Sequence, residues 1–226
     1  MTLNDLPEIQ ITRNIRSTRL RLRVEPTRIR LTVPIFCTKK QIQSFIDQSE
    51  TWLLQTWQAQ QDKIIKIDRT LPTEICLFNL DFPVKIEYCT QKNNFVFDAE
   101  NLILRISDRT PENYLKAFVV EYAKEQLPIY LHDVSLDIGL KFTECSIRQP
   151  KTRWGSCSAQ QKIMLNSALV LYSKEVVRYV CVHELAHTVH FNHSTQFWQL
   201  VNQHDVNLKT HQKQLKTKPV PYWWIT

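Results

Sequence analysis

The stretch HELAHTVHFNHSTQFW, residues 183–198, gathers the side chains of this sequence that are best suited to chemistry. Four of the chain's seven histidines fall within eleven residues there, beside Glu184. Imidazole is the commonest metal ligand among side chains, and a carboxylate beside a metal-bound water can accept a proton from it. These residue types indicate a metal centre that activates water.

The spacing of two of these histidines fits one face of a helix. Ser173 can cap that helix, and apolar residues recur at helical spacing through VVRYVCVHELAHTVHF. His183 and His187 then lie one turn apart, close enough for both rings to reach one ion, and Glu184 projects beside them. The pattern is HExxH, two metal ligands with an adjacent carboxylate. Histidines that are merely polar surface or hydrogen-bonded core groups are the alternative, and their clustering disfavours it.

A long helix and two strands should position this segment. Thr110-Pro111-Glu112 predicts the start of the long helix, Pro128 a break or kink in it, and Gly139 its C-terminal cap. Strand-like segments follow at 141–149 and 162–169, and they should form a hairpin-like unit.

The turn KTRWGSCS, residues 151–158, lies between these two strands and allows two interpretations. An extended strand at this point could offer its edge to a peptide substrate, with Arg153 or Trp154 near the cleft. Alternatively, Trp154 and Cys157 pack beneath the active helix while Gly155 makes the turn. We favour packing, and we also expect the aromatic pair at 197–198 to belong to the core.

KTRWGSCS, IMLNSAL and VVRYVCVHELAHTVHFNHSTQFW together resemble the YgjP-like metallopeptidases, whose pattern is an RWGSCS turn followed by HELxHxxxxNHSxxFW. The match in order and spacing covers about residues 110–205, and the N-terminal region resembles that family less specifically. The resemblance implies a zincin-like (minigluzincin) fold, related to the SprT-like and WLM metalloproteases. It also implies that Zn²⁺ is held by His183, His187 and His193 and that Glu184 is the catalytic acid/base. It does not establish a substrate.

Helix geometry bears on the choice of the third ligand. On an uninterrupted helix His190 shares the face of His183 but stands about 10.5 Å along the axis, too far for ligands that must converge at about 2.0–2.1 Å from zinc. His193 can reach the ion only if the chain turns back. Asn192 tolerates the left-handed conformation that ends helices, and Ser194 can begin the next one. We therefore expect His193, and not His190, to complete the site.

Such a site would hydrolyse peptide bonds. Three neutral imidazoles leave one zinc position open for water, and the cation lowers the pKa of that water from about 15.7 towards about 7. Glu184 can accept the water's proton and return it to the leaving amine. The rival hypotheses are a nucleic-acid-binding protein with a structural zinc, and a DNA-associated metalloprotease. Closed structural zinc sites usually have four protein ligands, often including cysteine, so the motif favours a zinc metallopeptidase that acts on proteins or peptides.

The basic residues are concentrated near the start of the chain. Residues 1–40 hold nine Lys or Arg and three Asp or Glu, which accounts for +6 of the net +7. RLRLRVEPTRIRLTVP, residues 19–34, alternates with period two on both sides of Glu25-Pro26-Thr27 and predicts a hairpin. One face should be apolar, and the other should carry Arg19, Arg21, Arg23, Arg28 and Arg30. We favour a solvated face with nearby acidic side chains over a surface for nucleic acid or another polyanion.

The expected fold class is α+β, in two parts. Residues 1–107 should form a mostly β region with one helix over 39–58 and strands within 75–88 and 95–107. Residues 108–226 should form the metallopeptidase domain. Its aromatic tail KPVPYWWIT either docks on that domain or binds a partner, and both interpretations stay open.

Composition sets the remaining limits. With 226 residues and 43% apolar content, the chain can bury one sizeable core, or a main domain with a smaller companion. Neither a signal peptide nor an apolar run of about 20 residues is present, so we expect a soluble cytoplasmic protein without a membrane partner. The six cysteines include no CxxC pair and are expected to be reduced and mostly buried.

Overall fold

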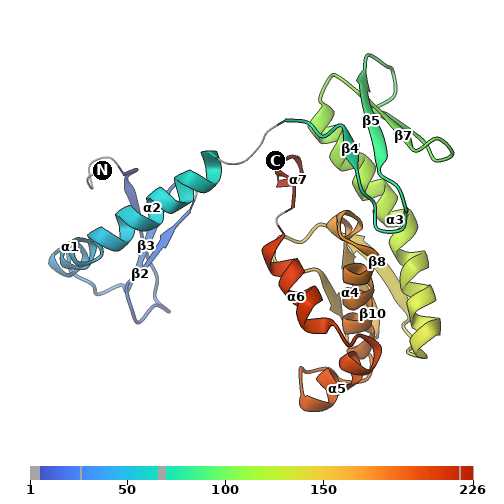
Figure 1. Ribbon diagram of the computed structural model, residues 1–226. Coiled ribbons are helices and arrows are strands. Elements are labelled where there is room, and N and C mark those ends of the chain that lie inside the picture. Colours follow the sequence, from blue (N-terminus) through green and yellow to red (C-terminus); the bar gives the residue numbers. More distant parts are fainter. Residues whose placement is uncertain (1–5, 26, 66–69, 219, 226) are drawn as a thin grey trace. The chain divides into compact units, whose positions relative to one another are not determined.

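The computed structural model describes residues 6–25, 27–65, 70–218 and 220–225. The chain divides into two compact units, Met1–Asp68 and Arg69–Thr226, and each is described by itself (Figure 1). Both units combine strands with helices, which confirms the α+β class. Among the described residues, no helix combines the length and the apolar character needed to cross a membrane.

The first unit contains a three-stranded sheet. Its strands are β1 (Ile9–Arg13), β2 (Arg21–Val24) and β3 (Ile29–Val33), in the order β1-β3-β2. The antiparallel pairing of β2 with β3 confirms the predicted hairpin. The parallel pairing of β1 with β3 was not predicted.

Both faces of this hairpin carry the side chains that the alternation predicts. The inward residues belong to two hydrophobic clusters: Leu20, Leu22, Val24, Ile29, Leu31 and Val33. On the other face, Arg23 is the cross-strand partner of Arg30. Glu25 forms ion pairs with Arg28 at 2.5 Å and with Arg30 at 3.8 Å. An acidic side chain therefore offsets part of the positive charge, as the favoured interpretation of this face expects.

The single helix predicted over 39–58 is wrong, because two helices replace it. They are α1 (Lys39–Gln48) and α2 (Glu50–Ile65), and they are separated at Ser49. Leu53 and Trp57 on α2 are buried, whereas Trp52 is 48% exposed.

The second unit begins with a four-stranded sheet that packs against a long helix, α3 (Pro111–Ile138). Its strands have the order β4-β5-β7-β6 and are β4 (Glu74–Ile75), β5 (Val84–Cys89), β6 (Phe95–Asp98) and β7 (Ile103–Ser107). Phe95 and Phe97 meet the ring of Phe118 on α3 edge-on, with centroids 5.6 and 5.3 Å apart.

These strands share one hydrophobic core with the elements that follow them. Leu104 and Ile106 of β7 are fully buried in the same cluster as Leu115 of α3. The compact units accordingly divide at Asp68–Arg69, whereas the predicted domain boundary lies at residue 107. Periodicity identifies a strand but does not show which core the strand joins.

Helix α3 has the predicted ends. Pro111 occupies its first turn, and Gly139 caps it with a left-handed φ of 70°. Pro128 lies inside the helix without ending it, so of the predicted break or kink the break does not occur. The helix packs against α4 (Lys174–Ala186), which carries the HExxH motif.

A second sheet supports α4. Its order is β8-β10-β9, with β8 (Glu144–Arg148), β9 (Gly155–Cys157) and β10 (Lys162–Asn166). The hairpin predicted between 141–149 and 162–169 is wrong, because β10 pairs with β8 in parallel and with β9 antiparallel. Gly155 is the first residue of β9 and does not make a turn. Its place in the strand brings β9 against α4.

The C-terminal elements complete this unit around α4. A 3-10 helix (Ser167–Leu171) precedes α4, and α5 (Thr195–His204), α6 (Leu208–Thr217) and α7 (Tyr222–Ile225) follow it (Figure 1). Trp223 and Trp224 of the tail are buried in the core of the unit. Of the two open interpretations of the tail, docking on the domain is the one observed.

Candidate metal centre

The chain reverses direction directly after the HExxH motif. Helix α4 ends at Ala186, with His187 as its C-cap, and the amides of Val189 and His190 donate to the Ala186 carbonyl. The expectation that Asn192 ends the helix in a left-handed conformation is wrong. Asn192 is not among the described non-glycine residues with positive φ, and the helix ends before it.

Ser194 caps the next helix, as predicted. Its hydroxyl accepts a hydrogen bond from the amide of Phe197 in the first turn of α5. The reversal between the two helices brings His193 back to the end of α4. The ligand atoms of His183, His187 and His193 all lie within 4.8 Å of one another, and no other described group of three or more His, Cys, Asp or Glu has this geometry.

The distances in this cluster suit a small ion. The Nε2 atoms of His183 and His193 are 3.1 Å apart. Two nitrogens about 2.0–2.1 Å from one tetrahedral zinc would stand roughly 3.3 Å apart. The side chain of His190 lies outside the cluster.

The outer nitrogens of two rings have partners that orient them. His187 Nδ1 lies 3.0 Å from the backbone carbonyl of His190, so in the tautomer that donates there Nε2 is left for a metal. The Tyr179 hydroxyl lies 3.5 Å from His183 Nδ1 and accepts a hydrogen bond from Gln212 of α6 at 3.0 Å. Sequence reasoning missed these partners. The contact of Tyr179 could have been predicted, because Tyr179 precedes His183 by one helical turn. Nothing in the sequence indicates the contact of Gln212.

Phe197 forms an aromatic floor beneath all three histidines. Its ring stacks on His187 with centroids 4.4 Å apart and meets His183 and His193 edge-on at 4.9 and 4.8 Å. Trp198 stacks on His193 at 5.4 Å. The expectation that this aromatic pair belongs to the core is confirmed for Phe197, which is fully buried, and Trp198 is partly buried against the core. Their contacts with the imidazoles were not predicted.

The environment keeps the two partly buried histidines, His183 and His187, neutral, which is the form that binds a metal. Burial, with a further contribution from His187 and His193, lowers the pKa of His183 to about 3. Burial also lowers the pKa of His187. The donor set therefore fits a cation that prefers nitrogen ligands.

Glu184 lies on the neighbouring face of α4, against the edge of the second sheet. Its side chain is buried, and a Cβ at Gly155 would be only 2.5 Å from Glu184 Oε1. Burial raises the pKa of Glu184 to about 8, and the positive charge of Arg153 opposes this rise. A cation bound at the histidines would oppose it further, because an opposite charge favours the ionised carboxylate.

Glu184 faces a cavity of about 230 Å³. The cavity is also lined by His183 and by Arg153 and Trp154, the two residues predicted to lie near a cleft. Trp154 additionally packs edge-on against Tyr172, with centroids 4.9 Å apart, and lies against the core of the unit. The arginines predicted as a possible polyanion-binding face belong to the first unit, whereas this cavity is lined by residues of the second unit.

Comparison with known proteins defines the class of this protein. A family model described as "YgjP-like, metallopeptidase domain" matches residues 18–218, and the chain belongs to this family. It is therefore a metallopeptidase, a hydrolase that uses a metal ion and acts on proteins or peptides. No curated protein matches the chain.

Two solved structures show a limited similarity to the chain. The metallopeptidase zymogen of Pyrococcus abyssi abylysin is 24% identical, covers 42% of this chain and 97% of its own, and has a TM-score of 0.38. The metallopeptidase zymogen of Methanocaldococcus jannaschii jannalysin is 18% identical, covers 42% of this chain and 98% of its own, and has a TM-score of 0.37.

Proposed function

We propose that this protein is a zinc-dependent peptidase in which Glu184 assists the attack of water on a peptide bond. The observation that carries the proposal is the convergence of the ring nitrogens of His183, His187 and His193 beside a cavity that Glu184 also lines. Zinc supplies Lewis acidity, which polarises a carbonyl and lowers the pKa of a coordinated water.

Zinc is the proposed metal because of the ligands. Three imidazoles without a cysteine or a carboxylate leave one tetrahedral position open, as in catalytic zinc sites. The same set of three ligands disfavours a structural zinc in a nucleic-acid-binding protein, because structural zinc sites usually have four protein ligands.

Glu184 is the proposed proton carrier. It is held beside the cluster by the close approach of Gly155, and its buried carboxylate faces the cavity. From there it can take the proton of the attacking water and then donate it to the leaving amine.

The substrate is proposed to bind along β9. This strand is at the edge of the sheet order β8-β10-β9, and its first residue touches Glu184. An extended peptide that added to this edge would bring its backbone past the carboxylate, and Arg153 and Trp154 would lie at the end of the strand. A cytoplasmic location is also proposed, because all six cysteines are free thiols.

The test combines metal analysis with cleavage of an unfolded protein substrate by the parent and Glu184→Gln. The variant should keep about one zinc per chain, because the histidines are intact, while its turnover should fall by roughly 10²–10⁴-fold. Equal turnover in the two proteins would overturn the role of Glu184. Absence of cleavage by the zinc-loaded parent on any substrate would overturn the proposed function.

A further inference from the structure

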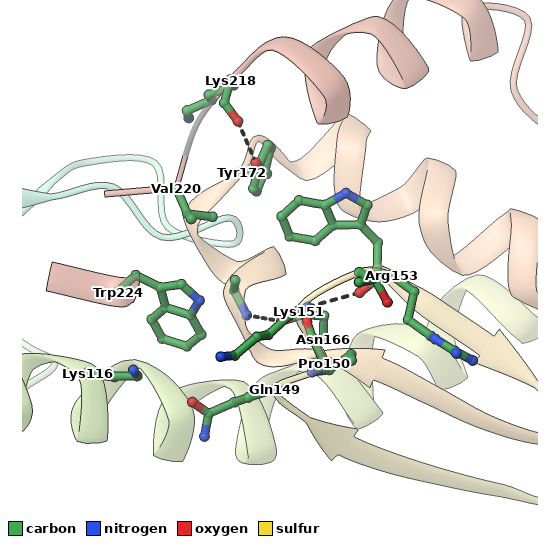
Figure 2. Close-up of a pocket in the computed structure, with 13 residues that line it drawn as sticks. Lys116, Gln149, Pro150, Lys151, Arg153, Asn166, Tyr172, Lys218, Val220 and Trp224 are labelled. Carbon is green, nitrogen blue, oxygen red and sulfur yellow. Dashed lines mark hydrogen bonds between the residues drawn. The ribbon is translucent and has the colours of Figure 1, made fainter. Parts of the chain in front are cut away.

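A larger cavity, of about 510 Å³, adjoins the catalytic one and shares Arg153 and Trp154 with it (Figure 2). Its walls come from separate parts of the second unit. The loop 149–154 between β8 and β9 forms one wall, Lys116 of α3 another, and Lys218, Val220 and Trp224 near the C-terminus a third. A peptide held in the catalytic cavity therefore has a second space next to it.

The cavity is held open by contacts within its own walls. The side-chain amide of Asn166 donates to the carbonyls of Pro150 and Arg153 at 2.9 and 3.0 Å, which fixes the loop. On the opposite side the Tyr172 hydroxyl donates to the carbonyl of Lys218 at 2.8 Å, and the Tyr172 ring packs on Trp154. These contacts fix the walls, so the cavity is part of the folded structure of this unit.

Its charge is positive. Lys116, Lys151 and Lys218 line it, and none of the described residues that line it is acidic. The ammonium group of Lys218 is partly engaged, since it donates to the Leu171 carbonyl at 3.2 Å and lies over the Tyr172 ring. Lys116 lies 5.8 Å from the centroid of the Trp224 ring. In Figure 2, Lys151 extends toward the side of the cavity where Trp224 lies, and the Arg153 guanidinium points away from it.

We propose that this cavity is a substrate subsite that binds a carboxylate of the peptide next to the cleaved bond. The inference rests on the proposed function. Carboxylates are the anions that an unmodified peptide carries, and two ammonium groups can hold one by charge-assisted hydrogen bonds. The aromatic walls accommodate the aliphatic part of an acidic side chain or the last residue of a chain. The shared chemistry is a carboxylate, whether from Asp or Glu or from a C-terminus.

The test begins with one peptide that the zinc-loaded full-length protein cleaves, found in a digest of an unfolded protein. Variants of this peptide carry Glu or Gln at each position that flanks the cleaved bond in turn, and a separate pair ends in a free or an amidated C-terminus. At the position that reaches the subsite, the carboxylate form should have a kcat/KM roughly tenfold higher than its neutral partner. If Glu is preferred over Gln at one position, the subsite binds an acidic side chain. If only the free C-terminus is preferred over the amidated one, the subsite binds the C-terminal carboxylate.

Protein variants connect this preference to the cavity. The double variant Lys116→Gln, Lys151→Gln should reduce the ratio of the two kcat/KM values to near one. Lys141→Gln is the matched control, because this exposed lysine lies outside both cavities, and it should keep the full ratio. Lys151→Glu should make a Lys-containing peptide a better substrate than its Gln partner.

Two outcomes separate the possible failures. If the neutral peptides are cleaved but the carboxylate gives no advantage, or if the lysine variants keep the advantage, the subsite is wrong and the proposed function stands. If the zinc-loaded parent cleaves no peptide, the proposed function fails, and the subsite fails with it.

Discussion

The backbone of Gly155 lies so close to the carboxylate of Glu184 that a Cβ at residue 155 would stand 2.5 Å from Glu184 Oε1 and 2.6 Å from its Cγ. This distance is well inside van der Waals contact, and the Glu184 side chain is buried, which limits where it can move. Glycine at residue 155 is thus needed for the position of the proposed proton carrier. Its φ plays no part, because Gly139 is the glycine with a positive φ in the described residues.

The first prediction follows from this contact. Gly155→Ala should displace the Glu184 carboxylate and lower turnover by about tenfold or more, since a shift of about 1 Å at a catalytic group is costly. Crowding should also reduce the free energy of unfolding by about 1–3 kcal/mol. Zinc content should stay near that of the parent, because the histidines are not touched. Metal analysis, denaturant unfolding and peptide cleavage measure the three effects.

The neighbouring substitution Ser156→Ala is the control for Gly155→Ala. It lies on the same strand and removes an oxygen without adding bulk, so turnover should remain close to that of the parent. A Gly155→Ala protein with parental turnover would show that Glu184 does not need its present position.

The second prediction separates the two histidines that follow the HExxH motif. His193→Ala should lose zinc, because it removes a ring nitrogen from the cluster. His190→Ala should keep zinc, because the contribution of His190 is its backbone carbonyl, which lies 3.0 Å from His187 Nδ1 and survives the substitution. Zinc titration of both proteins checks the assignment. A zinc-replete His193→Ala beside a zinc-free His190→Ala would reverse it.

The third prediction concerns the aromatic floor. Phe197→Leu should weaken zinc binding by about 10–100-fold, the usual effect of losing a group that orients metal ligands. The reason is that the Phe197 ring contacts all three imidazoles. The measurement is competition for zinc against a chelator of known affinity.

Val201→Ala is the matched control for Phe197→Leu. Val201 is equally buried on the same helix, so its truncation destabilises the fold without removing a contact with the histidines. Similar zinc affinities in the two variants would mean that Phe197 supports the fold alone.

The sequence predicted the parts of this site that depend on local spacing. His183, Glu184 and His187 lie within about one helical turn, and the Ser194 cap is a local signal, so both could be identified before the fold was known. Gly155 was misread as a turn residue, because its role depends on a contact with α4 across 29 residues of sequence. The two helices α1 and α2 were predicted as one, because no glycine or proline marks the boundary at Ser49. Local periodicity gives no information about contacts between residues that are far apart in the sequence.

The last prediction concerns the arginine face of the first unit, where polyanion binding is still a hypothesis. Glu25 is ion-paired with Arg28 and Arg30, whereas no such pair is recorded for Arg19, Arg21 or Arg23 in the described part of the chain. If this face binds DNA, replacing those three arginines with Gln should weaken retention on a DNA column and reduce the slope of log K against log salt by about 2.7, since each phosphate contact contributes about 0.9.

The controls for this experiment separate the effect of where the charges lie from the effect of the total net charge. The triple variant Lys124→Gln, Lys141→Gln, Lys213→Gln removes the same net charge from the second unit, and it should leave the salt slope unchanged. Glu25→Gln should strengthen retention, because it releases two arginines from their ion pairs. If the arginine variant and the lysine variant elute together at every salt concentration, retention reflects total charge and the face has no role in binding. The favoured interpretation, a solvated sheet face whose charge Glu25 partly balances, would then account for these arginines.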